Sequence, residues 1–303
     1  MRKPLLSILS LSFAISGINC SDGNHFEGKG RFVYSNNSDH LMELDFSTRR
    51  QRQIRYSQSK NIEEFIFYIT RFSDHEVILA AESLMSGMPT LKLLNLVTNE
   101  AKNLGQGSSP TYVAEHKALF FYVTDKPYGP IENMALFVVE IGSLEKARAI
   151  CQIPKVDSVL SGMFARPVVQ ISADVVVFCG RGKALTEYDC ITSKVTETNL
   201  KDLYPLGWRE KSGEVICIDQ HQRSLYLVKW TNKIVRRVES IEADDYTIGW
   251  TYIEEIDALI FGDERLRDEF IYYYDFRESA VKKLGTAAKI RSNGAYFPAG
   301  SIW

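Results

Sequence analysis

The residue types that most often do chemistry are scattered in this chain. Its histidines are His25, His40, His75, His116 and His221, and no two of them have the i, i+4 spacing that lets helical histidines share a metal ion. His25 lies near the N-terminus, and the other four fall in expected hairpin turns beside polar residues. We therefore interpret them as turn residues on the surface, and predict no metal site, no cofactor and no catalytic residue.

Three pairs of adjacent acids deserve the same examination, because paired carboxylates can bind a hard cation or act as acid and base. Asp244-Asp245 and Glu254-Glu255 are interpreted as solvated loop charges, and Asp263-Glu264 is the third pair. The segment 180–183, Gly-Arg-Gly-Lys, is not followed by a helical pattern, so a tight hairpin turn explains its glycines. The sequence therefore favours a binding protein, while catalysis stays open as an alternative.

The first twenty residues predict export. Arg2 and Lys3 precede an uncharged, largely apolar stretch of residues 4–21, the pattern of a secretory signal peptide. Gly17-Ile18-Asn19-Cys20 is similar to a bacterial lipobox, although Asn19 departs from the usual small residue. We expect a lipoprotein-type signal peptide at 1–19, lipidation of Cys20, a tether at 20–25 and a folded domain at 26–303, at the cell envelope. Cleavage after Ala14-Ile15-Ser16 is the alternative, and would release a soluble periplasmic or secreted protein.

Composition limits the partners. The formal net charge is −2 at pH 7, and no basic cluster stands out, so nucleic acid is excluded as an expected partner. Without a second apolar segment, membrane contact is expected only through the lipid. Cys151, Cys179, Cys190 and Cys217 lie in or beside expected strands without metal-like spacing, which favours small buried thiols.

The elements that must position any site repeat six times. Each repeat has an apolar opening, alternation, a polar residue at its fifth position, a short turn and a polar strand. Repeats begin at positions 41, 91, 136, 185, 225 and 271, about 46 residues apart on average. Their fifth residues are Asp45, Asn95, Glu140, Asp189, Lys229 and Asp275. Since Asp45, Asp189 and Asp275 hold the same position in their repeats, we expect them to hydrogen-bond the amides of the following turn.

Before each such segment lies another pair of short apolar runs joined by a polar turn, so a unit holds four strands, A to D. Four strands in about 46 residues is the size of a propeller blade. The first blade, at Arg31–Ser35, begins with its second strand, and Gly294–Trp303 supplies a spare strand at the end. We therefore predict an all-β, six-bladed β-propeller that closes when the C-terminal strand pairs with the N-terminal blade and covers its edge. Seven blades with one degenerate is the alternative.

The blades resemble the TolB-like and related six-bladed propellers of bacterial envelopes. The resemblance rests on turns such as Ser73–Glu76 and Lys211–Glu214, and on strand endings such as Leu41…Asp45 and Ile271…Asp275. It covers nearly the whole mature chain, but the turns depart from the family's Pro-Asp-Gly style. The resemblance implies a scaffold for protein partners or a ligand at the channel mouth, and some relatives are enzymes.

The candidate binding face is the one where loops between strands B and C, and connections from D to the next A, are expected to emerge. Aromatic residues and arginine carry much of the energy at protein interfaces. The candidates are Tyr112, Tyr128, Arg166, Arg181, Tyr204, Trp208, His221, Arg223, Tyr246, Trp250, Arg265, Arg267, Arg291 and Asn293. Trp208 and Trp250 each follow a glycine at equivalent positions of adjacent blades, so we favour packing between blades as their role.

We therefore expect a monomeric, non-enzymatic binding or scaffolding lipoprotein of the bacterial envelope that binds a protein partner through this face. The alternatives are a propeller hydrolase or lyase acting on an extracellular polymer, and a propeller that binds a small ligand or a sugar.

Overall fold

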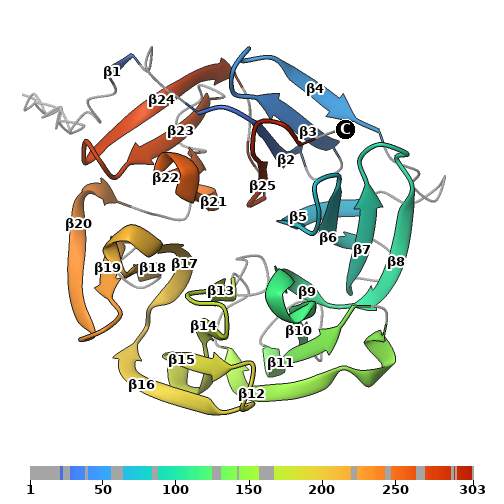
Figure 1. Cartoon of the computed structure of the whole chain (residues 1–303), viewed down its shortest axis with the longest axis vertical. Helices are drawn as coiled ribbons and strands as arrows, with labels where there is room; N and C mark the ends of the chain where they lie inside the picture. The colour runs from blue at the N-terminus through green and yellow to red at the C-terminus, as the bar shows by residue number, and fades with distance from the viewer. Residues whose placement is uncertain are drawn as a thin grey trace, which may run out of the picture.

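Six four-stranded antiparallel sheets stand in a ring around a central channel (Figure 1). The computed structural model describes residues 21–22, 28–37, 40–55, 64–83, 88–124, 131–141, 143–156, 167–219, 224–242, 247–263, 270–287, 290 and 292–301. The all-β, six-bladed prediction is confirmed.

The strands follow one another from the channel outward within each blade. Blade 1 holds β25 (Ala295–Phe297), β2 (Arg31–Asn37), β3 (His40–Asp45) and β4 (Gln51–Ile54), and blade 2 holds β5 (Glu64–Arg71), β6 (Glu76–Ser83), β7 (Pro89–Asn95) and β8 (Ala101–Gln106). Blade 3 holds β9 (Ser108–Val113), β10 (Ala118–Thr124), β11 (Ile131–Glu140) and β12 (Arg148–Val156), and blade 4 holds β13 (Val169–Gln170), β14 (Val175–Cys179), β15 (Ala184–Asp189) and β16 (Val195–Lys201). Blade 5 holds β17 (Tyr204–Arg209), β18 (Glu214–Asp219), β19 (Ser224–Lys229) and β20 (Ile234–Glu242), and blade 6 holds β21 (Thr247–Ile253), β22 (Ala258–Asp263), β23 (Phe270–Asp275) and β24 (Ala280–Ala287).

The helical elements are short 3-10 turns. They are η1 (Ala114–His116), η2 (Leu144–Lys146), η4 (Arg181–Lys183), η5 (Glu210–Ser212) and η6 (Glu254–Ile256). Among the described residues, no helix is long and apolar enough to cross a bilayer.

The core is divided into the interfaces between blades. Six apolar clusters each combine residues of two neighbouring blades, as Phe32 and Phe46 of blade 1 do with Ile260 and Tyr273 of blade 6. Each sheet is therefore buried on both faces, which is why the second strands read as nearly continuous apolar runs. In β6, residues 77–81 are fully buried.

The ring closes as predicted. β25 pairs antiparallel with β2, with Arg31 opposite Phe297 and Val33 opposite Ala295. Phe297 is fully buried, in the cluster between blades 1 and 2. The C-terminal strand therefore serves as the inner strand of the first blade, and its described part is shorter than the predicted Gly294–Trp303.

The repeated polar residue shapes the turn after strand C, as predicted. Asp45 Oδ1 accepts a hydrogen bond of 2.8 Å from the amide of Thr48, and Asp189 Oδ1 accepts one of 2.7 Å from Thr192. Asn95 and Asp275 do the same in blades 2 and 6. In five blades, the residue four positions after the repeated polar residue has a positive φ. These residues are Arg49, Asn99, Ser193, Lys233 and Ser279.

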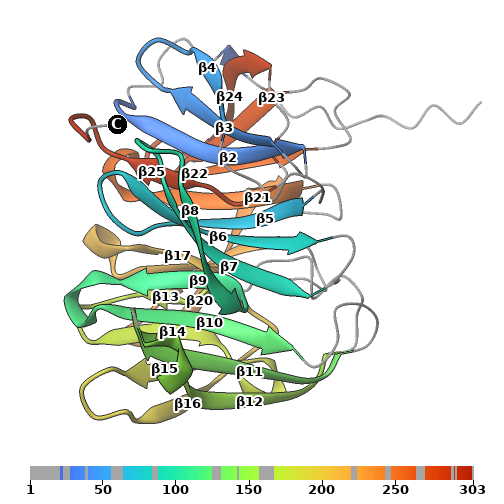
Figure 2. The same ribbon diagram turned by 90° about the vertical axis from the view of Figure 1, so that its right-hand side faces the viewer.

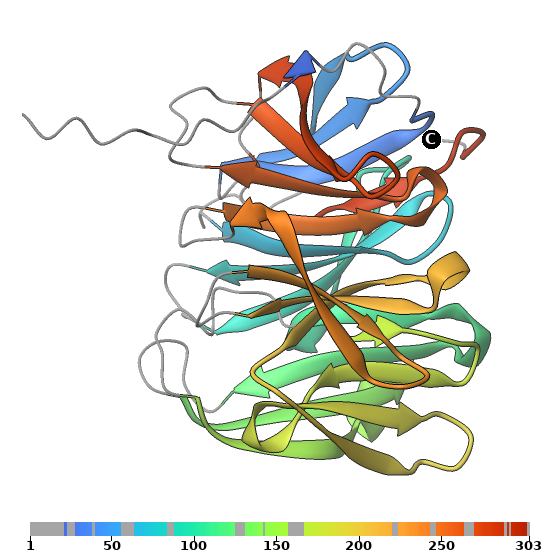
Figure 3. The same cartoon turned by 90° about the vertical axis from the view of Figure 1, so that its left-hand side faces the viewer.

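Strand direction gives the ring two different faces (Figures 2 and 3). The A–B and C–D turns lie on one, here called the turn face. The B–C loops and the D-to-A connections lie on the other, the loop face. Most of the described turns belong to the turn face, and η4 belongs to the loop face.

One short strand adds to the outside of the ring. β1 (Ser21–Asp22) pairs parallel with β24, so blade 6 has a fifth strand. Sequence analysis placed these two residues in the tether. Cys20 and the rest of the predicted signal peptide lie outside the described residues.

The four described cysteines are free thiols. Cys179 and Cys217 are buried, and Cys151 and Cys190 are half-buried. Burial raises the pKa of Cys190 to about 11, helped by the nearby carboxylates of Asp189 and Asp174, so this thiol is a poor nucleophile at neutral pH.

Candidate functional site in the central channel

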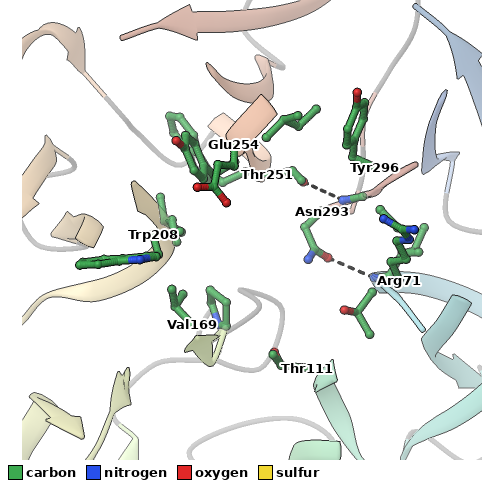
Figure 4. A pocket seen from close by; sticks show the side chains of 18 of the residues that line it. Arg71, Thr111, Val169, Trp208, Thr251, Glu254, Asn293 and Tyr296 are labelled. Carbon is green, nitrogen blue, oxygen red and sulfur yellow. Dashed lines mark hydrogen bonds between the residues drawn. The ribbon is translucent and has the colours of Figure 1, made fainter. Parts of the chain in front are cut away.

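A pocket of about 380 Å³ occupies the central channel, and the inner strands of all six blades line it (Figure 4). Each blade contributes at least one residue, for example Arg71 from β5, Thr111 from β9, Val169 from β13, Trp208 from β17, Thr251 from β21 and Tyr296 from β25. Neighbouring blades cover both apolar faces of each sheet. The innermost strand of each sheet is therefore left facing the channel. The pocket therefore exists only in the closed ring.

Asn293 joins three blades within this pocket. Its Oδ1 accepts a hydrogen bond of 3.2 Å from the amide of Ile69 in blade 2, and its side chain also hydrogen-bonds Tyr68. The next amide, that of Gly294, donates to Thr251 Oγ1 of blade 6 at 2.8 Å. The segment that closes the ring is thus tied to the blade on each side (Figure 4).

Two carboxylates stand at the pocket where β21 ends. Glu254 and Glu255 form the first turn of η6, and both side chains are exposed. Partial burial raises the pKa of Glu254, and the negative charges of Glu210 and Glu255 raise it further. Within the described part of the chain, neither carboxylate has an ion pair. Lys211 is a described cation whose charge acts on Glu254, and Glu210 is a further acid that hydrogen-bonds Glu254. Among these described residues, the acids outnumber the cation at this end of the pocket.

Arg71 is the cation that lines the pocket, but its charge is already engaged. Its Nη2 lies 2.6 Å from Asp74 Oδ1, and its Nε donates to the carbonyl of Ser73 at 3.3 Å. The guanidinium also lies over the ring of Phe297, 5.4 Å from its centroid. Arg71 thus stabilises the A–B turn of its own blade. The excess charge at the pocket is negative.

Aromatic side chains form part of the wall. Trp208, Trp250, Tyr252 and Tyr296 all line the pocket. Tyr252 donates to Asp257 Oδ1 at 2.9 Å, and the Tyr296 hydroxyl donates to the carbonyl of Lys29. These hydrogen bonds hold the rings in place beside the carboxylates.

The described candidate residues divide into two groups. Trp208, Trp250 and Asn293 line the channel pocket. Tyr112 packs on Phe72 of blade 2, with ring centroids 4.6 Å apart, Arg181 is exposed in η4 on the loop face, and Tyr204 is buried. Eight further candidates and the lipidation site lie outside the described residues, namely Tyr128, Arg166, His221, Arg223, Tyr246, Arg265, Arg267, Arg291 and Cys20.

Tyr112 and Trp208 do not lie where sequence analysis put them. Each is the penultimate residue of an inner strand, next to an A–B turn and so near the turn face. The D-to-A connections are shorter there than expected, because β9 and β17 begin only a few residues after the preceding outer strands end.

Trp208 and Trp250 are also not equivalent in the structure. Trp208 is opposite Val215, the second residue of its partner strand, a position that Tyr252 holds in blade 6 opposite Leu259. One strand residue follows Trp208 before its A–B turn, whereas three follow Trp250, so Trp250 lies two residues farther from the turn. Both tryptophans do pack against the clusters between blades, the role that sequence analysis favoured for them.

The histidine and acidic residues considered in sequence analysis either have structural roles or lie outside the described residues. His116 is half-buried, with its Nε2 3.0 Å from Asp174 Oδ1 of the next blade. Asp244-Asp245 and Glu264 lie outside the described residues. No group of three or more His, Cys, Asp or Glu side chains arranged for a metal ion occurs in the described part of the chain.

Sequence analysis interpreted Glu254-Glu255 as loop charges and did not single out Arg71 or Tyr296. Their common signal was position: each stands within two residues of the C-terminal end of an inner strand. Knowing that the inner strand ends there would have placed them at the channel.

No known family profile and no curated protein matches the chain. Solved structures do match. TolB from Acinetobacter baumannii superposes with a TM-score of 0.65 at 10% identity, over 89% of this chain and 67% of that one. A chain of a nidogen–laminin complex gives 0.58 at 9% identity, over 88% and 98%, and a protein of unknown function from Bacteroides thetaiotaomicron gives 0.55 at 11% identity, over 89% and 86%. The chain is therefore a six-bladed β-propeller whose fold is similar to that of TolB.

Proposed function

We propose that this protein is a non-enzymatic binding propeller of the bacterial envelope, which holds a segment of a protein partner in the channel pocket. The observation that carries the proposal is the pair Glu254 and Glu255, two exposed carboxyl groups at a pocket lined by all six blades. A cavity of about 380 Å³ lies within the size range of ligand sites in proteins.

The chemistry of the pocket selects a cationic group. A lysine or arginine side chain on an inserted segment would pair with the two carboxylates while its methylenes pack on Trp208 and Tyr296. Partial enclosure would strengthen this attraction relative to an exposed ion pair. The likeness in fold to TolB supports an envelope protein as the setting of the proposal.

We propose that export and acylation of Cys20 bring the domain to the membrane. Mass spectrometry of the mature chain from the native bacterium tests this part separately. A diacyl or triacyl group on an N-terminal Cys20 is the expected result, and a mature chain that begins before Cys20 would overturn it.

A site-specific photocrosslinker tests the binding site itself. Placed at Gln170, which lines the pocket, it should capture a defined partner in native cells, whereas the same group at Lys102 on the outer strand β8 should not. Replacing both acids, Glu254→Gln with Glu255→Gln, should reduce the captured amount at least severalfold. Equal capture by the double variant would refute the role of the carboxylates.

A second candidate function rests on Glu254. A carboxyl group with a raised pKa in a pocket suits a general acid, so a hydrolase or lyase acting on an extracellular polymer is the alternative. Incubation with envelope polysaccharides distinguishes the two: product release that Glu254→Gln abolishes would establish the enzyme. Binding of a free sugar or amine without capture of a protein would instead indicate a small-ligand propeller.

A further inference from the structure

The outer edge of blade 1 is strongly basic. Arg49, Arg50, Arg52 and Arg55 lie within or beside β4, the outermost strand of the blade. Glu43 on the neighbouring strand pairs with Arg52 and with Arg31. Arg50 and Arg55 are exposed, and no acidic side chain among the described residues forms an ion pair with either of them. The edge therefore has positive charge beyond what its own strand partner offsets.

A groove runs along this edge. It has a volume of about 360 Å³, and lies between β4 and the C–D turn of blade 2. Arg52, Gln53, Ile54 and Arg55 form one wall, and Leu96, Val97 and Asn99 form the other. The buried side chains of Ile54 and Leu96 give the groove an apolar part, and Val97 is 55% exposed.

The position of β4 in its sheet suits the addition of a strand. In the order β25-β2-β3-β4, no described strand follows β4. An outer strand offers main-chain groups with which an extended peptide can pair. Side chains on an added strand alternate between its two faces, so every second one would face the groove.

Blade 6 shows such an addition within this same chain. There, β1 pairs parallel with the outer strand β24, and its Asp22 lies opposite Lys283. A two-residue strand that contains one acid has thus added to an outer strand that contains two lysines. Blade 1 has the same combination of an outermost strand and excess positive charge, and no strand among the described residues pairs with the outer edge of β4.

We infer that β4 and the adjoining groove form a second binding surface, which takes an extended acidic segment of a partner protein as an additional strand. Carboxylates of that segment pair with the exposed Arg50 and Arg55, and apolar parts of its side chains contact Val97. This surface is separate from the channel pocket, so the inference does not depend on the proposed function.

A defined probe tests the inference with the whole mature domain. The probe is a fluorescent peptide of alternating threonine and glutamate, and its counterpart carries lysine in place of glutamate. Fluorescence anisotropy should show that the acidic peptide binds and the basic one does not. Arg50→Glu with Arg55→Glu should weaken binding by roughly tenfold or more, because it replaces attraction by repulsion. Lys102→Glu, a charge reversal on the outer strand of blade 2, should leave binding unchanged.

Hydrogen exchange separates strand addition from simple anion binding. The acidic peptide should slow exchange at residues 51–55, and inorganic phosphate should neither do so nor displace the peptide. Equal binding by the arginine double variant and the Lys102 control would overturn the inference, as would binding without slowed exchange or displacement by phosphate. The variant Glu254→Gln/Glu255→Gln should bind the peptide normally, which keeps this outcome distinct from that of the channel.

Discussion

Arg209 of blade 5 holds Asp257 of blade 6 through two hydrogen bonds, 2.8 Å from Nε to Oδ1 and 2.7 Å from Nη2 to Oδ2. The same guanidinium donates to Glu214 Oε2 at 2.6 Å and lies over the ring of Phe276, 4.5 Å from its centroid. Tyr252 donates to Asp257 as well. This partly buried network joins two neighbouring blades at the turn face, beside the channel pocket.

Breaking this network should destabilise the domain. Asp257→Asn removes the charge that compensates Arg209, and should lower the free energy of unfolding by about 1–3 kcal/mol, since the pair is largely but not fully buried. Asp74→Asn is the matched control, because it removes the exposed partner of Arg71 at another A–B turn, and should cost less than about 1 kcal/mol. Urea unfolding of both variants measures the difference. If both variants lose the same free energy of unfolding, the network between blades 5 and 6 contributes no more to stability than the exposed ion pair of Arg71.

Stability should fall in acid. Burial alone would raise the pKa of Asp257 and of Asp275, but hydrogen bonds and charges from Arg209 and Tyr252, and from Arg277 and Lys282, outweigh it and lower both below 3.8. An acid with a lowered folded-state pKa contributes stability above its unfolded pKa, and loses it as the pH falls through the folded value. We expect the free energy of unfolding to decline below about pH 4, and less steeply in Asp257→Asn. Identical slopes in the two proteins would contradict this assignment.

The repeated turn residue can be tested at Asp45. Asp45→Asn retains the acceptor for the amide of Thr48, as Asn95 does naturally in blade 2, and should change stability little. Asp45→Ala leaves that amide without its partner, and should cost about 1 kcal/mol. Thermal unfolding of both variants gives the comparison. If asparagine costs as much as alanine, the charge of the turn residue matters and the hydrogen bond does not.

Gly207 lies at a close approach of two inner strands. A Cβ placed there would lie 2.5 Å from the Cβ of Tyr252 in the next blade, so Gly207→Ala should force the blades apart and cost about 1–3 kcal/mol. Gly182→Asn is the control, because a Cβ at that position meets nothing within 4 Å, and asparagine tolerates its φ of 61° better than most residues. Calorimetry of the two variants should show a lowered melting temperature for Gly207→Ala alone.

Binding of a cationic segment should depend on pH through Glu254. Its pKa is raised from 4.5 by partial burial and by Glu210 and Glu255, so its negative charge is lost at a higher pH than that of an ordinary glutamate. Affinity for a lysine-containing ligand should therefore weaken on acidification before most carboxylates titrate. Calorimetric titrations across this range with the native domain and Glu254→Gln provide the measurement. A pH profile unchanged by Glu254→Gln would assign the effect to another group.

Several features of the fold follow from local sequence. Six repeats with strand-like alternation predict six blades, because each sheet has two apolar faces that only neighbouring sheets can cover. The spare strand at the C-terminus predicts closure, since the first blade lacks its inner strand. Asp45 and Asp189 predict their turn hydrogen bonds, which join residues only three apart.

The candidate site does not follow in this way. Asn293 contacts Ile69, 224 positions away, and Trp250 lies two residues farther from its A–B turn than Trp208 does, although both tryptophans follow a glycine.

The chain by itself thus determined the blades, their number and their turns, because strand alternation and short-range hydrogen bonds are local properties. Only the tertiary structure decided which side chains meet in the channel. Closing the ring brings one short stretch from each of six distant strands to a common axis. The register of each inner strand then determines which residue of that stretch faces the axis.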